Sequence, residues 1–317
     1  MKIAVLFPGQ GSQFLGMGQE FINENTTSAA LMAMAEAACE ICLGALCADG
    51  PMEELIRATN LQPAITITNL ICWRRFQEEL RDKVAVSYLA GHSLGEYSAL
   101  CAAGVLSIED TVRLVSKRGA LMEREGTRNP GGMRAVLGLD IKTLDAIIDG
   151  YRGEGVVTTA NHNTPEQIVI SGSFAGLEGV SRLAEEKGAK VIPLNVSVAN
   201  HSPLVAAAIP DFTDFMANIE FKVPSIPVYF NVSASPESDP LKIKEMMARQ
   251  IGSRVRWCEI IEAMLADGVD TFIEVGPKTV LKGMMKKIIP RGTKVTALQL
   301  DSPATLLSCL EHINKEL

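Results

Sequence analysis

The chain has 317 residues, of which 47% are hydrophobic and 21% are charged, and its formal net charge is −7. This composition is typical of a soluble globular protein, and the negative charge argues against nucleic-acid binding, which needs a broad positive field. No apolar run reaches the ~18–20 residues that span a membrane, so we expect no membrane association.

The N-terminus and the cysteines indicate a cytoplasmic protein. The apolar run in MKIAVLFPGQ is short and is broken by Pro-Gly, which favours a buried strand over a signal peptide. The seven cysteines are odd in number and scattered, as expected of reduced thiols. Cys39, Cys42 and Cys47 lie close together, but no second cluster supplies further ligands, so we expect no metal site; their role stays open.

The first third of the chain alternates short apolar strands with amphipathic helices. Ser107 and Asp110 in SIED form a capping box that begins one of these helices. Strands that alternate with helices of this length predict a parallel sheet covered on both faces. The expected strands are residues 2–9 and 84–91, and the expected helices are residues 28–47, 63–80, 94–104 and 107–124.

The pattern changes after REGTRNPGG, a polar segment rich in glycine. The following elements have the order β-α-β-β-α-β, which predicts a ferredoxin-like unit. We therefore expect an α/β fold with a large α/β-hydrolase-like domain (1–127 and 196–317), into which a ferredoxin-like subdomain (128–195) is inserted. A ligand is expected in the cleft between them. In chain order, the expected elements are 133–139, 141–151, 155–161, 166–172, 174–188 and 189–196, then strands at 226–231, 270–276 and 293–300.

The segment Gly91-His92-Ser93-Leu94-Gly95 has the pattern G-x-S-x-G between a strand and a helix. In this setting the glycines allow a strained turn that exposes the serine, and the next N–H, from Leu94, points to a developing oxyanion. The sequence therefore predicts Ser93 as a nucleophile. The alternative is an ordinary N-cap serine in a glycine-rich turn.

A nucleophilic serine needs a base, and His201 is the candidate that we favour. It lies in NVSVANHSPL, where the chain re-enters the large domain, and it follows Ser93 in the chain order usual for this fold. No Asp or Glu stands out as the third member, so a main-chain carbonyl could orient the imidazole. The other histidines are His92, His162, which could line the cleft, and His312, which we expect on the surface.

The turn FPGQGSQ after the first strand carries Gln10 and Gln13. No G-K-[ST] follows it, which excludes a P-loop. Its backbone could supply a second oxyanion donor, although such a turn is more often purely structural.

Six motifs together resemble one family. They are FPGQGSQ, GHSLGEYSAL, SKRGALM, ANHNTPEQIVISG, NHSPL and FIEVGPKTVLKGMMKKI, and they extend from residue 3 to about residue 290. The chain resembles the malonyl-CoA:acyl-carrier-protein transacylases of fatty-acid synthesis and the related acyltransferase domains of polyketide synthases.

The resemblance implies a ping-pong transfer through a malonyl-serine enzyme to the pantetheine thiol of acyl carrier protein. It implies that Ser93 is the nucleophile and that His201 is the base. The main chain of Gln250 would hold the histidine, and Gln10 and Leu94 would supply the oxyanion N–H groups. No cofactor is implied beyond the substrate malonyl-CoA and the phosphopantetheine of the carrier.

The resemblance also implies that Arg118 binds the malonyl carboxylate, which a guanidinium can hold in bidentate fashion. A surface helix arginine is the alternative. We further expect His92, Asn161 and Asn200 to bind substrate. Polyketide-type relatives often carry Phe where Asn200 stands. The resemblance therefore implies a CoA-linked dicarboxylic acyl group more strongly than it implies malonyl itself.

Three other functions fit parts of the pattern. A serine thioesterase that edits acyl carriers would share the serine and histidine but would have no use for a buried cation at Arg118. A trans-acting polyketide acyltransferase would take another extender unit. A non-catalytic carrier-binding module would not need the serine and histidine. Lys278, Lys282, Lys286 and Lys287 form one candidate patch for an acidic carrier, although a solvated helix face fits them equally well.

Overall fold

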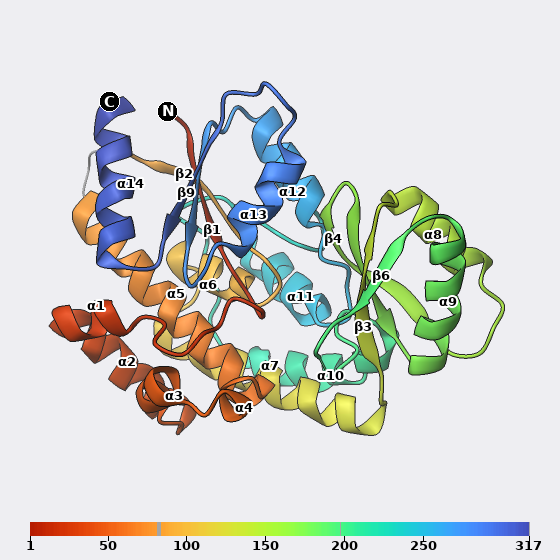
Figure 1. The fold of residues 1–317 in the computed structure, drawn as a ribbon. Helices are drawn as coiled ribbons and strands as arrows, with labels where there is room; N and C mark the ends of the chain where they lie inside the picture. Colours follow the sequence, from red (N-terminus) through yellow and green to blue (C-terminus); the bar gives the residue numbers. More distant parts are fainter. Residues whose placement is uncertain (81–83, 197, 317) are drawn as a thin grey trace.

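The computed structural model describes residues 1–80, 84–196 and 198–316, which form two separate sheets (Figure 1). The larger sheet has five strands, all parallel, in the order β7-β2-β1-β8-β9. This confirms the expected parallel sheet of an α/β fold. Its strands are β1 (Ile3–Phe7), β2 (Val86–Gly91), β7 (Val228–Tyr229), β8 (Thr271–Val275) and β9 (Thr296–Leu300).

The central strand β1 is buried on both faces, because helices cover both sides of the sheet. Ile3, Val5 and Phe7 face a core shared with the long helices α5 and α7, while Ala4 and Leu6 face a second core shared with α12 and α13. The helices of this part are α1 (Gln19–Glu24), α2 (Thr26–Cys39), α3 (Leu43–Asp49), α4 (Met52–Leu55), α5 (Ala58–Leu80), α6 (Gly95–Ala102), α7 (Ile108–Arg128), α10 (Ala208–Ala217), α11 (Pro240–Gln250), α12 (Trp257–Ala266), α13 (Val280–Ile288) and α14 (Pro303–Glu316), with the 3-10 helix η1 (Pro203–Val205).

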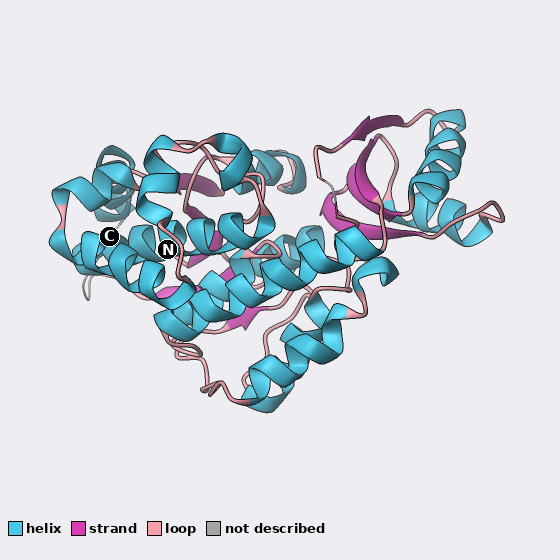
Figure 2. Cartoon of the chain, turned by 90° about the horizontal axis from the view of Figure 1, so that it is seen from below, coloured by secondary structure: helices cyan, strands magenta, loops and turns pink. Residues whose placement is uncertain are grey.

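The smaller sheet is antiparallel throughout, with the strand order β4-β5-β3-β6. Its elements follow the chain order β-α-β-β-α-β, as expected of a ferredoxin-like unit. Figure 2 shows it to one side of the larger sheet, with its two helices on the outer face. The domain boundaries that we predicted stay predictions. The elements are β3 (Gly132–Leu137), α8 (Ile141–Gly150), β4 (Val157–Thr164), β5 (Gln167–Gly172), α9 (Phe174–Glu186) and β6 (Lys190–Pro193).

Several helix boundaries differ from the sequence expectation. The helix expected after Pro63 begins five residues earlier, at Ala58, and its first turn packs closely on α7: a Cβ on Gly119 would lie 2.4 Å from the Ala58 carbonyl oxygen. The helix that we ended at Arg124 continues to Arg128. The helix expected over 28–47 is two helices, separated at Glu40, whose φ of 59° is left-handed.

In the described part of the chain, no single helix is long and apolar enough to cross a membrane. Only the pair α2 and α3, bent by 113° between them, passes that test by length and composition together.

Candidate active site

Ser93 occupies a sharp turn between β2 and α6. Its φ of 50° is left-handed, which is strained for a residue with a side chain. The turn is possible because its neighbours are glycines: a Cβ on Gly95 would lie 2.1 Å from the Phe7 carbonyl oxygen, and one on Gly91 would lie 1.9 Å from the Gly95 carbonyl carbon. This strained strand-to-helix turn is the geometry that exposes a serine hydroxyl above a parallel sheet.

His201 lies against this serine, with its Nε2 2.8 Å from the Ser93 Oγ. Its Nδ1 lies 3.1 Å from the Gln250 carbonyl oxygen and 2.9 Å from the Ser253 carbonyl oxygen. Since both are acceptors only, we assign the ring proton to Nδ1, which leaves the Nε2 lone pair facing the serine. Burial, reinforced by the charge of Arg118, lowers the pKa of His201 to about 3, so the imidazole is neutral near pH 7.

Arg118 on α7 is fully enclosed, with 1% of its surface exposed. Its Nη2 donates hydrogen bonds to the Ser93 Oγ (3.2 Å) and the Gln250 Oε1 (3.1 Å), and its Nη1 donates to the Gln62 Oε1 (2.9 Å). Within the described residues, these partners are all neutral, and its Nε has none. A buried cation without a carboxylate partner is costly, so the site is suited to a ligand that brings one.

The turn after β1 approaches the elbow closely. A Cβ on Gly9 would lie 2.5 Å from the His92 carbonyl oxygen and 3.4 Å from the Leu94 Cβ. Across residues 1–80, 84–196 and 198–316, neither the Gln10 nor the Leu94 backbone N–H donates a hydrogen bond. Two free N–H groups near the serine oxygen could both point at an oxyanion.

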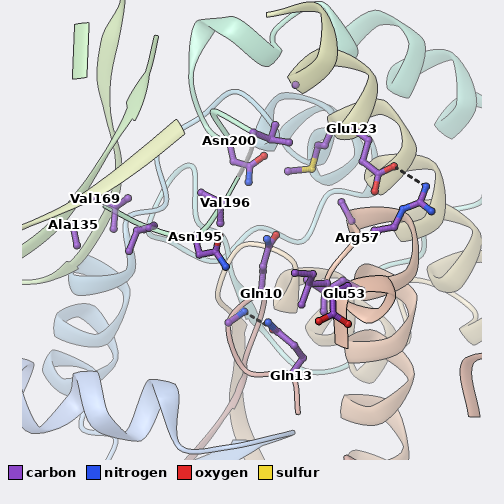
Figure 3. Close-up of a pocket in the computed structure, with 18 of the residues that line it drawn as sticks. Gln10, Gln13, Glu53, Arg57, Glu123, Ala135, Val169, Asn195, Val196 and Asn200 are labelled. Carbon is purple, nitrogen blue, oxygen red and sulfur yellow. Dashed lines mark hydrogen bonds and ion pairs between the residues drawn. The ribbon is translucent and has the colours of Figure 1, made fainter. Parts of the chain in front are cut away.

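A cavity of about 870 Å³ lies beside this cluster, between the smaller sheet and the helices α5 and α7. Ser93, His201 and Arg118 are not among its lining residues, but near neighbours of the cluster are, including Gln10, Met122 and Asn200. Figure 3 shows Gln10 and Gln13 on the loop after β1, Arg57 and Glu123 at one side, and Val169 of the smaller sheet at the other. The volume is within the range of small-molecule sites.

Two predicted substrate-binding residues do not line the cavity. Asn161 lies in β4 and forms an isolated bridge with Val255, and the partnerless Oδ1 of Asn161 is buried. His92 points away from Ser93: its Nε2 lies 2.8 Å from the Asn163 Oδ1. Asn163, two residues after Asn161, is the β4 asparagine that does line the cavity.

Four polar residues of the site escaped the sequence analysis. They are Gln62, Glu96, Asn231 and Ser253, whose contacts with the cluster join segments far apart in the chain. Only Glu96 had a local signal, as an acidic residue within an apolar helix start. His162, expected to follow a strand, lies within β4, where its Nδ1 is 3.0 Å from the Glu259 Oε2.

The cysteine cluster stays without an assigned role. Cys39, Cys42 and Cys47 are free thiols, and burial raises the pKa of Cys47 to about 12. Over the described ranges, no group of three or more His, Cys, Asp or Glu side chains could hold a metal ion.

A serine–histidine pair at the turn above a parallel sheet is typical of enzymes that pass through an acyl-serine intermediate. The chain belongs to the acyl transferase family, whose domain matches residues 5–300, and this confirms the resemblance found in the sequence.

Similar proteins are found over nearly the whole chain. The malonyl CoA-acyl carrier protein transacylase of Bacillus subtilis strain 168 is 40% identical, over 99% of this chain and 98% of that protein. The crystal structure of an acyl carrier protein S-malonyltransferase from Vibrio cholerae is 37% identical, with a TM-score of 0.89 over 98% of this chain and all of that one. A malonyl-transacylase in complex with a type II polyketide acyl-carrier protein is 35% identical, with a TM-score of 0.93 over 98% of this chain and all of that one.

Proposed function

We propose that the chain transfers a malonyl group from malonyl-CoA to the phosphopantetheine thiol of acyl carrier protein. The observation that carries this proposal is the buried Arg118 guanidinium, 3.2 Å from the Ser93 Oγ and without a carboxylate partner in the described residues. The names of the similar proteins support the same reaction.

In the first half-reaction, the Ser93 Oγ attacks the thioester carbonyl while its proton moves to the His201 Nε2. The free N–H groups of Gln10 and Leu94 would stabilise the oxyanion. The tetrahedral intermediate collapses as the C–S bond breaks, and the imidazolium returns the proton to the departing CoA sulfur. The product is a malonyl ester on Ser93.

In the second half-reaction, the carrier thiol gives its proton to the His201 Nε2 and its sulfur attacks the ester carbonyl. The C–Oγ bond breaks, and Ser93 takes the proton back. The same base and oxyanion donors serve both halves, as expected of a ping-pong mechanism.

Arg118 would hold the far carboxylate of the acyl group. A guanidinium offers two parallel N–H donors to a carboxylate, and a malonyl group differs from acetyl by this carboxylate alone. A thioesterase of simple acyl chains would gain nothing from this buried cation, so that alternative is less well supported.

The reaction needs no metal or further cofactor, and we propose that it takes place in the cytoplasm. All seven cysteines are free, as expected in a reducing compartment. Arg118 supports a dicarboxylic acyl group, and Asn200 lines the cavity beside the cluster.

The proposal is tested by incubating the protein with malonyl-CoA and recording its intact mass. One malonyl adduct is expected, which holo acyl carrier protein removes and which Ser93→Ala lacks. An unmodified protein, or an adduct that persists in Ser93→Ala, would contradict it. Hydrolysis measured alongside separates transfer from thioesterase activity.

A further inference from the structure

We propose that Glu96 is a positioning residue of this site: its buried carboxylate fixes the Gln250 amide, and through it the Ser93 turn and the Arg118 guanidinium. The proposal rests on the function proposed above, because it assigns Arg118 to the acyl carboxylate. It concerns a residue that contacts neither the substrate nor the Ser93 side chain.

Glu96 is the second residue of α6 and is fully buried. Its Oε1 accepts a hydrogen bond from the Asn231 backbone N–H (2.7 Å), and its Oε2 accepts one from the Gln250 Nε2 (2.7 Å). Burial raises the pKa of Glu96 to about 7, while these two donors and the charge of Arg118 favour the carboxylate form. Both oxygens act as acceptors, because each faces an N–H donor.

The contacts of Gln250 leave its amide one orientation. Its Nε2 donates to two acceptors, the Glu96 Oε2 and the Ser93 carbonyl oxygen (2.7 Å each), so its Oε1 is free to accept from the Arg118 Nη2 (3.1 Å). A flipped amide would place an NH2 group against the guanidinium and an oxygen against a carboxylate. Glu96 thus determines which end of the amide Arg118 meets.

Asn231 holds the other side of the turn. Its Oδ1 accepts from the Ser93 N–H, and its Nδ2 donates to the Gly91 carbonyl oxygen, both at 2.7 Å. The peptide groups on both sides of the strained Ser93 are therefore held by side chains, and Glu96 binds both holders. Since the Gln250 carbonyl oxygen also accepts from the His201 Nδ1, one carboxylate is connected to the nucleophile, the base and the cation.

Glu96→Gln removes one acceptor without changing the size of the side chain. A glutamine has one oxygen, so its NH2 must face either the Asn231 N–H or the Gln250 amide. In the second case, Gln250 turns its oxygen towards residue 96 and its NH2 towards Arg118. Either outcome loosens the turn, and the second also displaces the cation that would select the acyl group.

The experiment compares kcat/KM for malonyl-CoA and acetyl-CoA, in transfer to holo acyl carrier protein, for the wild type, Glu96→Gln, Gln250→Ala and the double variant. We expect Glu96→Gln to lower malonyl transfer about tenfold or more and to lower the malonyl-to-acetyl ratio, because a small displacement of an orienting group costs this much. If Glu96 orients Arg118 through Gln250, the malonyl-to-acetyl ratio of the double variant equals that of Gln250→Ala.

Glu274→Gln is the matched control. Glu274 is also buried and also accepts two N–H groups, from Leu281 and Lys282, and burial also raises its pKa to about 7. Glu274→Gln is expected to lower the unfolding temperature but to leave the malonyl-to-acetyl ratio of kcat/KM unchanged. If Glu96→Gln does not fold, Glu96→Asp gives the same ratio test.

An unchanged ratio in Glu96→Gln, or a ratio in the double variant lower than that of Gln250→Ala, would overturn the positioning role. These results are distinct from failure of the proposed function, in which the wild type itself forms no malonyl adduct on Ser93.

Discussion

Replacing Arg118 with alanine is expected to abolish the preference for a carboxylated acyl group while leaving Ser93 able to react. The guanidinium has 1% of its surface exposed, and its hydrogen bonds within the described chain go to neutral oxygens of Ser93, Gln62 and Gln250. A carboxylate of the substrate would be the first anion to which it donates a hydrogen bond. The nucleophile, base and oxyanion donors remain in the variant.

The expected size follows from the burial of this cation. Removing one member of a buried, hydrogen-bonded charge pair costs about 2–5 kcal/mol. At about 1.36 kcal/mol for each factor of ten, kcat/KM for malonyl-CoA should fall roughly 30- to 5,000-fold. Acetyl-CoA has no carboxylate to lose, so its transfer should stay the same or rise.

The assay is steady-state transfer of malonyl and acetyl groups from CoA to one carrier protein. Lys117→Ala is the matched control, since its ammonium lies over the Phe215 ring, 5.7 Å from its centroid, and not at the site. Arg118→Lys keeps the charge but not the two parallel donors, so an intermediate ratio is expected. Equal losses for malonyl and acetyl in Arg118→Ala would refute the reasoning.

Further predictions concern the base, the turn and the carrier surface. The pKa of His201 is lowered from 6.5 to about 3, so between these two pH values only the unfolded chain takes up this proton. The stability of the fold therefore falls as the pH falls from 6.5 to about 3, and the drop in Tm over this range should be smaller in His201→Gln. Gly95→Ala should prevent folding, because its Cβ would lie 2.1 Å from a backbone oxygen. The control Gly283→Ala in α13 meets nothing within 4 Å and should raise the free energy of unfolding by about 1 kcal/mol. A soluble, active Gly95→Ala with wild-type circular dichroism would contradict this. Charge reversal at Lys282 and Lys286 should raise KM for the carrier only; an unchanged carrier KM, or an equal rise for malonyl-CoA, would leave α13 without a docking role.

The features that the sequence predicted well are local. The strand before Ser93, the two glycines beside it and the helix after it lie within a few residues, so the pattern of side chains specifies the turn directly. The alternation of strands and helices likewise predicts the parallel sheet, and the order β-α-β-β-α-β predicts the second one. His201 could be placed because the chain offers only four histidines.

The features that it missed depend on contacts between distant segments. Asn231 is 138 positions from Ser93, and Gln250 is 154 positions from Glu96, so neither contact leaves a local pattern. The place of Asn163 rather than Asn161 at the cavity lining has a related reason. Which residue of β4 reaches the cavity depends on how that strand packs on the larger unit, and the spacing of residues does not specify this.

The two main-chain carbonyls that orient His201 bear on the competition between the carrier and water in the proposed reaction. They fix the ring without supplying the negative charge of a carboxylate, and burial together with the charge of Arg118 lowers the pKa of the imidazole. A thiol, with a pKa near ~8.5, is already partly ionised at neutral pH, whereas water, with a pKa near ~15.7, depends almost wholly on a base. A base of lowered pKa thus favours the acceptor that depends on it least, which is the thiol of the carrier rather than water.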